Sequence, residues 1–464
     1  MTEPELIGAD RPELGPEPAG PDQWREQMIL QLLEEGVLVD PAIEDAFRAV
    51  PREVFAPADV DPRQVYEVHD VVRTRFAADG TALSSLSAPY MQAGNLRQAR
   101  VEPGMRVLEI GSGGPLASML THLVGPAGEV VTVDIDPGVT ARTRAGLERI
   151  GLADRVEVVT ADAARHLGRG LFDRVIVTVA GWTIPPVWLD QLTPDGLLVV
   201  PVRLMPGAQR ILTFRRDPAG PAAAATGGDR ERWSSVETVL GGFVPMQGAD
   251  VHDHPTRVVT GPSSGQMTFR FAEQVPDGFA ITEQTLQEEP ALAWSGVIYR
   301  DGELWVDLLL WLLLVLPDAC EITLDEAADT GHDRPFRVGT VKDDSFAILA
   351  RRVLPDGSIE VGSVGKGPAA VALTRRVAHS MHHFHTHHRG GDVGFHWWPN
   401  QNPHDLPPSV EHPNVRLLAR PHGTLTVTWP ALASPRAAQD DTLDRPGSSR
   451  RGRSLNTQPR RDAR

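Results

Sequence analysis

The sequence predicts an α/β fold with a parallel sheet in its first half, followed by a second region of α+β type. Between residues 101 and 214, short apolar segments alternate with segments of helical period, the order expected of repeated strand–helix units. The apolar segments are nearly continuous in hydrophobic residues, as in parallel strands that are covered on both faces. The length of 464 residues leaves room for two or three domains.

Six strands are predicted in this first half, at residues 106–110, 129–133, 156–160, 174–179, 197–201 and 211–214. Helices are predicted at residues 116–124, 138–150 and 186–192, and two short helices at residues 21–56. The apolar run at residues 308–316 is predicted to be a buried helix or strand, because a membrane-spanning helix needs about 20 apolar residues.

The composition divides the chain into five parts. Residues 1–20 are acidic and rich in proline, which predicts a disordered N-terminus without the features of a signal peptide. Residues 21–215 form the predicted first domain, residues 216–232 an Ala/Gly/Pro-rich linker, and residues 233–430 a C-terminal accessory domain. Residues 431–464 carry many arginines and few apolar side chains, which predicts a disordered basic tail.

The charge balance and the cysteine content exclude several classes of function. The 61 acidic and 45 basic residues give a net charge of −16, which argues against nucleic acid as the main partner, because phosphate contacts need a basic surface. The one cysteine, Cys320, excludes an intrachain disulfide and a cysteine-based zinc site. We therefore expect a cytoplasmic protein with no membrane segment.

The main chemical signal is a glycine turn between a strand and a helix, at residues 107–115 (VLEIGSGGP). Gly111, Gly113 and Gly114 let the backbone approach a ligand closely, and the free amides of the following helix can bind polar groups. The spacing is neither that of the G-x-G-x-x-G motif nor that of a P-loop. Taken alone, the turn could hold a dinucleotide, a nucleoside or no ligand at all.

Three acidic residues at strand ends sharpen this prediction. Asp134 ends the second strand, where a carboxylate can bind both hydroxyls of a ribose. Glu109 precedes the glycine turn, and Asp162 follows the third strand, where it can reach an adenine amino group. Such a set suits S-adenosylmethionine, which carries a sulfonium and an ammonium group but no phosphate. The alternative is that these carboxylates only cap helices.

These residues and several other segments resemble the protein-L-isoaspartate O-methyltransferase family. The resemblance covers about residues 22–215, and its markers are residues 50–55 (VPREVF), 87–91 (SAPYM), 107–114 (VLEIGSGG), 172–177 (FDRVIV) and 192–201 (LTPDGLLVVP). Residues 177–188 (VTVAGWTIPPVW) and 242–248 (GFVPMQG) are most similar to the methyltransferases of FxLD-type lanthipeptide clusters.

The resemblance implies a class I, Rossmann-like methyltransferase domain that uses S-adenosylmethionine. Residues implied to bind this cofactor are Glu109, Gly111, Ser112, Gly113, Gly114, Asp134, Ile135, Asp162, Ala163 and Thr178. Ser87 is implied to hydrogen-bond the acceptor carboxylate, Ala88 and Pro89 to form its pocket, and Trp182 to contact the substrate. For Ser87 the alternative is a helix N-cap, and for Trp182 a core or hinge aromatic.

The implied function is methylation of an Asp or isoAsp carboxylate in a ribosomally made, lanthipeptide-like peptide, with succinimide formation as a following step. The C-terminal region would recognise that peptide. Residues 77–86 (AADGTALSSL) replace the family's Gly-rich stretch with Gln-Thr, which leaves isoaspartate selectivity open. The alternatives are a general protein-L-isoaspartate repair enzyme and a non-catalytic peptide-binding scaffold. The sequence does not determine the oligomeric state.

Two further patterns are interpreted as structural. His379, His382, His383 and His387 fall at helical spacing, and the pair His383 and His387 could hold a metal. No carboxylate joins them, so we expect a solvated helix face and no metal site. Residues 362–367 (GSVGKG) are expected to form a turn and not a phosphate loop.

Overall fold

The computed structural model describes residues 20–78, 80–218, 231–261, 265–300, 303, 305–324, 338–407 and 412–430. It divides into two compact units, the first comprising residues up to 163 with 172–178, and the second residues 164–171 with 179 onward. The predicted disordered N-terminus, apart from Gly20, most of the predicted linker and the basic tail lie outside the described residues. The four boundaries between the five predicted parts stay a prediction.

The first unit begins with helices and a hairpin. Its first elements are α1 (Pro21–Glu34), α2 (Pro41–Ala49), the 3-10 helices η1 (Arg52–Phe55) and η2 (Pro62–Tyr66), the antiparallel strands β1 (Val72–Phe76) and β2 (Ala82–Leu86), and α3 (Pro89–Ala99). Both predicted short helices are present, and Pro51 ends the second of them because the residue before a proline disfavours the helical conformation.

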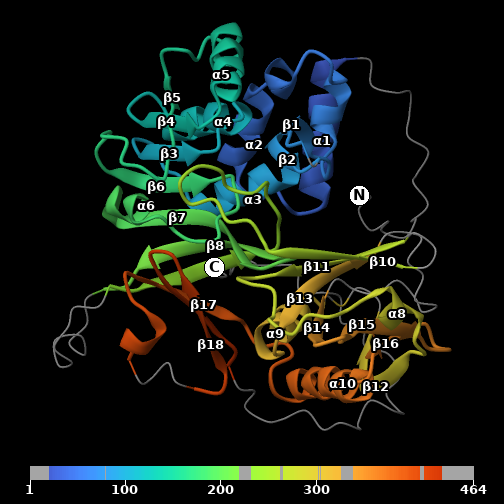
Figure 1. Ribbon diagram of the computed structural model, residues 1–464. Helices are drawn as coiled ribbons and strands as arrows, with labels where there is room; N and C mark the ends of the chain where they lie inside the picture. Colours follow the sequence, from blue (N-terminus) through green and yellow to red (C-terminus); the bar gives the residue numbers. More distant parts are fainter. Residues whose placement is uncertain are drawn as a thin grey trace, which may run out of the picture. The chain divides into compact units, whose positions relative to one another are not determined.

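A parallel sheet of four strands follows in the first unit, in the order β6-β3-β4-β5 (Figure 1). The strands are β3 (Arg106–Ile110), β4 (Glu129–Asp134), β5 (Val156–Thr160) and β6 (Phe172–Val177). Two helices pack on it, α4 (Pro115–Val124) and α5 (Pro137–Arg149). The first four predicted strands and the first two predicted helices are thereby confirmed, and the carboxyl ends of four parallel strands meet at one edge.

The second unit begins with an antiparallel arrangement that the sequence did not predict. The last two predicted strands are longer than expected, as β7 (Leu192–Met205) and β8 (Ala208–Arg216), and they pair antiparallel as a hairpin. The expectation of parallel strands is therefore wrong for the pairing of these two strands with each other. Only Pro206 and Gly207 connect them, a connection far too short for a parallel crossover, and Gly207 takes a positive φ of 73°.

Further strands extend this hairpin within the second unit, in the antiparallel order β18-β19-β17-β9-β8-β7. They are β9 (Trp233–Val239), β17 (Gly394–Pro399), β18 (Val415–Arg420) and β19 (Gly423–Thr428). The short helix α6 (Pro186–Asp190) precedes the hairpin, as predicted. Strands from both ends of the second unit thus share one sheet.

A seven-stranded antiparallel sheet completes the second unit, in the order β10-β11-β13-β14-β15-β16-β12. The strands are β10 (Thr256–Thr260), β11 (Gln266–Phe271), β12 (Ala291–Tyr299), β13 (Ala319–Leu324), β14 (Val338–Lys342), β15 (Ser345–Val353) and β16 (Ile359–Lys366), and the helices are α8 (Glu283–Gln287), α9 (Val306–Val315) and α10 (Ala370–His387). One core cluster of this sheet is built around Phe269, Ile322 and Phe346.

Two expectations for this unit can now be judged. The apolar run at residues 308–316 is mainly the helix α9, and no helix among the described residues is long and apolar enough to cross a membrane. Residues 362–367 were expected to be a turn, which is wrong, because residues up to Lys366 belong to β16. Gly362 and Gly365 serve close packing there: a Cβ would lie 2.5 Å from the Trp294 ring and 2.4 Å from the Phe346 carbonyl oxygen.

Candidate functional site

The glycine turn lies where β3 ends and α4 begins, as predicted. Gly111 and Gly114 have positive φ values of 97° and 96°, which residues with a side chain rarely adopt. Gly114 is the N-cap of α4, and Pro115 occupies the first helical position, where its missing N–H costs no hydrogen bond. The turn therefore needs glycine for its backbone conformation.

The Phe55 ring packs against the glycine turn and explains two glycines at once. A Cβ on Gly114 would lie 2.1 Å from Phe55 Cδ1, and a Cβ on Gly146 of α5 would lie 2.3 Å from the same atom. Phe55 is fully buried. The segment at residues 50–55 thus supports the turn through the phenylalanine at its end.

Hydrogen bonds from both neighbouring strands hold the turn in place. The Thr178 hydroxyl, just after β6, donates to the carbonyl oxygens of Gly111 at 2.7 Å and Ile110 at 3.1 Å. The Ser112 amide donates to Asp134 Oδ2 at 3.0 Å, and its hydroxyl donates to Thr143 Oγ1 at 3.0 Å. These bonds leave the backbone little freedom, so the turn is preorganised.

Asp134 lies at the carboxyl end of β4, beside the turn. Its second oxygen accepts from the Asp136 amide at 2.9 Å. Burial raises the pKa of Asp134 to about 6, although the hydrogen bonds from the amides of Asp136 and Ser112 oppose this rise. Each carboxylate oxygen has two lone pairs, so both can still accept from a ribose hydroxyl. Ile135, the next residue, exposes 38% of its surface, and its contact with a cofactor stays a prediction.

Glu109, in β3, is almost completely buried. It is 1% exposed, it accepts from the Thr132 hydroxyl at 2.5 Å, and burial raises its pKa to about 8. Its carboxyl group is therefore mostly protonated at pH 7, and its hydrogen bond with Thr132 joins β3 to β4. Direct contact of Glu109 with a cofactor stays a prediction.

Asp162 and Ala163 follow β5 at the same sheet edge. The amide of the preceding Ala161 donates to the Asp134 carbonyl oxygen at 3.0 Å, which brings this segment next to the end of β4. Both residues are partly exposed. Their position agrees with the expected adenine contact, which stays a prediction.

Ser87 lies between β2 and α3, and it does not cap the helix. The N-cap of α3 is Ala88 and Pro89 is its first residue, with no side-chain cap, so the N-cap alternative for Ser87 is wrong. Ser87 is half-buried, and its hydroxyl has no hydrogen-bond partner among the described residues. Leu86 reaches the turn, because its Cδ2 lies 3.5 Å from where a Cβ on Gly113 would be.

Arg52 fixes the backbone at Ser87. This arginine is 2% exposed, and its guanidinium donates to the carbonyl oxygens of Val65 and Ser87, both at 2.8 Å, and to the Gln92 side chain. Burial without a carboxylate partner lowers its pKa to about 10, so it remains charged at pH 7. A rigid cation therefore holds the Ser87 carbonyl and does not bind the hydroxyl.

The β1–β2 hairpin, which carries the unusual residues 77–86, is tied to the start of α5. Arg75 forms an ion pair with Asp136, whose other oxygen caps α5 by accepting from the Gly138 amide at 2.7 Å. The Arg142 guanidinium lies 3.5 Å from Thr74 Oγ1. The hairpin that leads to Ser87 is thus anchored two residues from Asp134.

The residues around the turn fit S-adenosylmethionine. The polar groups at the strand ends are carboxylates, threonine hydroxyls and backbone amides, which suit hydroxyl and ammonium groups. The two basic side chains near Asp134, Arg75 and Arg142, interact with the carboxylates of Asp136 and Asp134. Among the described residues there is also no group of three or more His, Cys, Asp or Glu side chains that could hold a metal ion.

Trp182 lies in the second unit and is 2% exposed. The Arg420 guanidinium lies over its ring at 3.6 Å from the centroid, and the His252 ring stacks on it at 4.3 Å with an interplanar angle of 7°. His254 meets it edge-on at 5.1 Å. These contacts match the core-aromatic alternative, and a substrate contact of Trp182 stays a prediction.

The histidines of α10 only partly form the expected solvated face. His379 is exposed, but His383 and His387 are half-buried and stack at 4.3 Å, and His383 also stacks on Trp311 at 5.7 Å. The expectation is wrong for these two because α10 lies over α9, which carries Trp311. Desolvation lowers the pKa of His383, which keeps it neutral at pH 7.

Three supporting residues were not selected from the sequence: Arg52, Phe55 and Arg75. The first two belong to the segment at residues 50–55, which pointed to the family but not to a role for each side chain. Arg75 lies in a hairpin without a recognisable motif, so no sequence signal indicated its ion pair. Each acts across more than 30 residues of chain, and only the fold reveals the contact.

The family profile "Protein-L-isoaspartate(D-aspartate) O-methyltransferase (PCMT)" matches residues 23–226. The protein-L-isoaspartate O-methyltransferase of Hyperthermus butylicus is 33% identical over 199 residues, which are 39% of this chain and 77% of that protein. The one of Pyrobaculum arsenaticum is 33% identical over 48% of this chain and 99% of its own. That of Bradyrhizobium sp. is 36% identical over 41% and 85%, respectively.

Among solved structures, a putative protein-L-isoaspartate O-methyltransferase of Plasmodium falciparum in complex with S-adenosyl-L-homocysteine is 16% identical, with a TM-score of 0.38, and covers 47% of this chain and 97% of that one. A second protein-L-isoaspartate O-methyltransferase is 19% identical, with a TM-score of 0.42, over 81% and 97%. The sequence relatives carry the assignment: the chain belongs to the protein-L-isoaspartate O-methyltransferase family and is an S-adenosylmethionine-dependent carboxyl O-methyltransferase.

Proposed function

We propose that the protein methylates the side-chain carboxylate of an Asp or isoAsp residue in a ribosomally made, lanthipeptide-like peptide. The observation that carries the choice of acceptor is the half-buried hydroxyl of Ser87, which has no hydrogen-bond partner among the described residues. Arg52 holds the carbonyl oxygen of the same residue, and the preceding Leu86 adjoins the glycine turn. A hydroxyl in this position can donate to one carboxylate oxygen and leave the other to react. Ala88 and Pro89 form the wall beside it.

S-adenosylmethionine supplies a methyl group on a sulfonium, which a carboxylate oxygen attacks from the opposite side. The acceptor carboxyl has an ordinary pKa near 4, so it is already ionised at pH 7 and needs no general base. What the chain contributes is position and exclusion of water, which can lower a barrier by roughly 7–11 kcal/mol. The preorganised turn and the anchored Ser87 are the groups that do this here.

The cofactor is proposed to lie on the turn formed by Gly111, Ser112, Gly113 and Gly114. Asp134 would bind its ribose hydroxyls, and Ile135 would cover its adenine. Asp162 and Ala163 would contact the adenine edge, and Thr178 holds the backbone beneath. Glu109 would support the turn indirectly, through its hydrogen bond with Thr132 of β4.

The ribosomal-peptide substrate is supported by three features. Residues 177–188 and 242–248 are similar to the FxLD-type lanthipeptide-cluster enzymes. The β1–β2 hairpin stands where the repair enzymes have a Gly-rich stretch. The three sequence relatives described above match at most 48% of this chain, so the second unit contains much that the basic reaction does not need. We propose that this surplus recognises the peptide.

The methyl ester can react further. The backbone amide nitrogen of the next residue attacks the ester carbonyl, and methanol leaves with the amide proton, which closes a succinimide. This step needs only a flexible peptide at Asp, since an ester is far more electrophilic than a carboxylate. A cytoplasmic location agrees with the single, buried Cys320.

One experiment separates this proposal from general repair. Methyl transfer is measured from radiolabelled S-adenosylmethionine to an arbitrary isoaspartyl hexapeptide and to a lanthionine-containing peptide with Asp. We expect a kcat/KM at least tenfold higher for the second peptide. Equal or greater activity on the hexapeptide would support general repair, the function by which the sequence relatives are named. Cofactor binding without transfer to either peptide would indicate a binding scaffold.

A further inference from the structure

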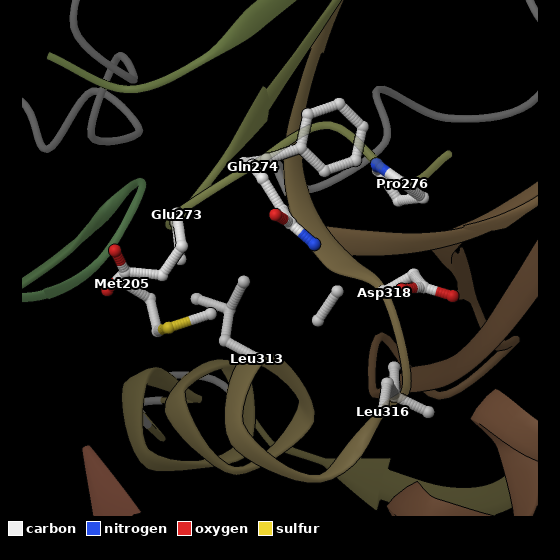
Figure 2. A pocket seen from close by; sticks show the side chains of 10 residues that line it. Met205, Glu273, Gln274, Pro276, Leu313, Leu316 and Asp318 are labelled. Atoms are coloured by element: carbon white, nitrogen blue, oxygen red, sulfur yellow. The ribbon is translucent and has the colours of Figure 1, made fainter. Parts of the chain in front are cut away.

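A surface pocket in the second unit has no part in the chemistry described so far. Its volume is about 250 Å³, and it lies between the end of β7, the loop after β11, the end of α9 and the start of β13 (Figure 2). The lining residues are Met205, Phe271, Ala272, Glu273, Gln274, Pro276, Leu313, Leu316, Asp318 and Ala319. This volume is below the range of about 300–1,000 Å³ typical of cofactor pockets and suits one amino-acid side chain.

The pocket combines an apolar floor with an acidic rim. Leu313 of α9 and Leu316, the residue after this helix, are buried and provide the floor, while Glu273, Gln274 and Asp318 are exposed. In Figure 2, the Gln274 side chain reaches toward the middle of the pocket, with Glu273 on one side and Asp318 on the other. The lining contains two carboxylates and no basic side chain.

The two carboxylates differ in how free they are. Glu273 is the ion-pair partner of Arg420 at 3.2 Å, although 60% of its side chain is exposed. The Asp318 carboxylate has no ion-pair or hydrogen-bond partner among the described residues. A cation in the pocket would therefore find one unpaired carboxylate and a second one that is only partly neutralised.

The ion pair also links the pocket to Trp182. The Arg420 guanidinium that meets Glu273 lies over the Trp182 ring and donates to the Leu204 carbonyl oxygen at 2.8 Å. Leu204 precedes the pocket residue Met205, and Trp182 lies four residues after Thr178, which holds the glycine turn. Competition for Glu273 in the pocket would thus change the electrostatics of an arginine packed on Trp182.

We propose that this pocket is an exosite for the peptide substrate, in which an apolar side chain enters between Leu313 and Met205 while an adjacent Lys or Arg pairs with Asp318 and Glu273. The inference rests on the proposed peptide methylation and adds that the peptide carries an apolar residue next to a Lys or Arg. Charge complementarity supports the choice of occupant: the rim is anionic and the chain carries a net charge of −16. An acidic or purely apolar segment would leave the rim carboxylates unpaired.

The probes are two fluorescein-labelled decapeptides without Asp, one with a central Leu-Arg pair and one with Leu-Glu, titrated with the full chain and S-adenosylhomocysteine at 50 mM salt. Fluorescence anisotropy should give at least tenfold tighter binding of the Leu-Arg probe. Asp318→Asn should weaken that binding about fivefold to tenfold. Asn tolerates the left-handed backbone at residue 318, where φ is 48°, so the fold is preserved.

Two further variants sharpen the test. Gln274→Trp places a large ring at the exposed position that reaches into the pocket and should weaken the Leu-Arg probe at least tenfold. Asp277→Asn removes the same charge nearby, at an exposed residue that does not line the pocket, and should leave binding within twofold. Equal binding of the two probes, or wild-type binding by Asp318→Asn and Gln274→Trp, would overturn the exosite.

The exosite and the proposed methylation can fail separately. Methyl transfer to a short isoaspartyl peptide without a Leu-Arg pair should be the same in all three variants and the wild type. If the wild-type chain transfers no methyl group but still binds the Leu-Arg probe more tightly, the proposed methylation is refuted and the exosite is supported. If it transfers methyl groups normally but binds both probes equally, the exosite is refuted and the proposed methylation is unaffected. Thermal denaturation confirms that each variant is folded.

Discussion

The two units gather their polar side chains in different ways. In the first unit, the carboxyl ends of parallel strands meet at one sheet edge, so Gly111, Asp134 and Thr178 lie together because each ends a strand or directly follows one. In the second unit, Trp182 is packed by His252 and Arg420, which come from a loop and from the strand β18. The first arrangement follows from local sequence, and the second depends on antiparallel pairing across more than 200 residues.

The largest effect on the first unit is expected from Gly114→Ala. The added methyl group would lie 2.1 Å from the buried Phe55 ring, and the residue must also keep a φ of 96°. Overpacking costs about 1–3 kcal/mol, and the left-handed conformation adds roughly 1–2 kcal/mol. Urea denaturation should show a loss of about 2–5 kcal/mol, and calorimetry should show no cofactor binding.

Gly104→Ala is the matched control for this substitution. Gly104 has a similar φ of 86°, but a Cβ there meets nothing within 4 Å. Only the conformational cost of about 1–2 kcal/mol applies, and cofactor affinity should be unchanged. Equal losses in the two variants would mean that the Phe55 contact does not shape the turn.

In the second unit, Arg420→Ala should have the next largest effect. Its side chain is 4% exposed, pairs with Glu273 and lies over Trp182, so truncation removes a buried hydrogen-bonded cation at a cost of about 2–4 kcal/mol. Arg420→Lys should recover part of this loss. The affinity for S-adenosylmethionine should stay within twofold in both variants, because the described hydrogen bonds of the glycine turn come from the first unit. If the variants lose cofactor affinity together with stability, the two units are not independent of each other.

Features that depend on local sequence could be predicted, and features that depend on contacts between distant segments could not. The parallel strands, the turn and the acids at strand ends were predictable because a βα unit places its ligand-binding residues at fixed points in the local sequence. The antiparallel β7–β8 hairpin was misassigned because its buried strands are as apolar as parallel ones. The Arg52 contact to Ser87 and the Arg420 contact to Trp182 join distant segments, and no local pattern marks them.

Asp134→Asn should lower the affinity for S-adenosylmethionine by about 10–100-fold, since hydrogen bonds to a charged group contribute about 1.5–3 kcal/mol. The pKa of Asp134 is raised to about 6, so the ionised form that attracts the cationic ligand is lost as the pH falls through 6. Calorimetry should therefore show wild-type affinity falling about tenfold per pH unit below pH 6, and a flat profile in the variant.

Asp136→Asn provides the comparison within the same turn. Asn caps a helix about as well as Asp, so the substitution keeps the cap of α5 and removes the ion pair with Arg75, which should lower stability by at most about 1 kcal/mol. Cofactor affinity should change less than threefold, because Asp134 keeps its two backbone hydrogen bonds. If both variants lose affinity equally, the carboxylate of Asp134 has no special role.

Ser87→Ala should reduce kcat/KM for the peptide about tenfold to a hundredfold while cofactor affinity stays unchanged. Its hydroxyl makes no other hydrogen bond among the described residues, so the folded state loses little. Ser84→Ala, in the same hairpin, removes a hydroxyl that bonds Thr74 at 3.0 Å and should leave kcat/KM within twofold. A wild-type rate in Ser87→Ala would refute the proposed carboxylate contact.

The last effect is a pH dependence of the stability of the first unit. Glu109 is buried and its pKa is raised to about 8, so the protonated form stabilises the fold and this contribution is lost as the pH rises through 8. Unfolding measured at pH 7 and pH 9 should differ by about 1.4 kcal/mol from this group. Glu109→Gln keeps a neutral, hydrogen-bonding side chain beside Thr132 and should remove that difference. Because the charge lies beneath the turn and not on it, the substitution should leave the pH profile of cofactor binding centred near 6, which separates a supporting carboxyl group from a ligand-binding one.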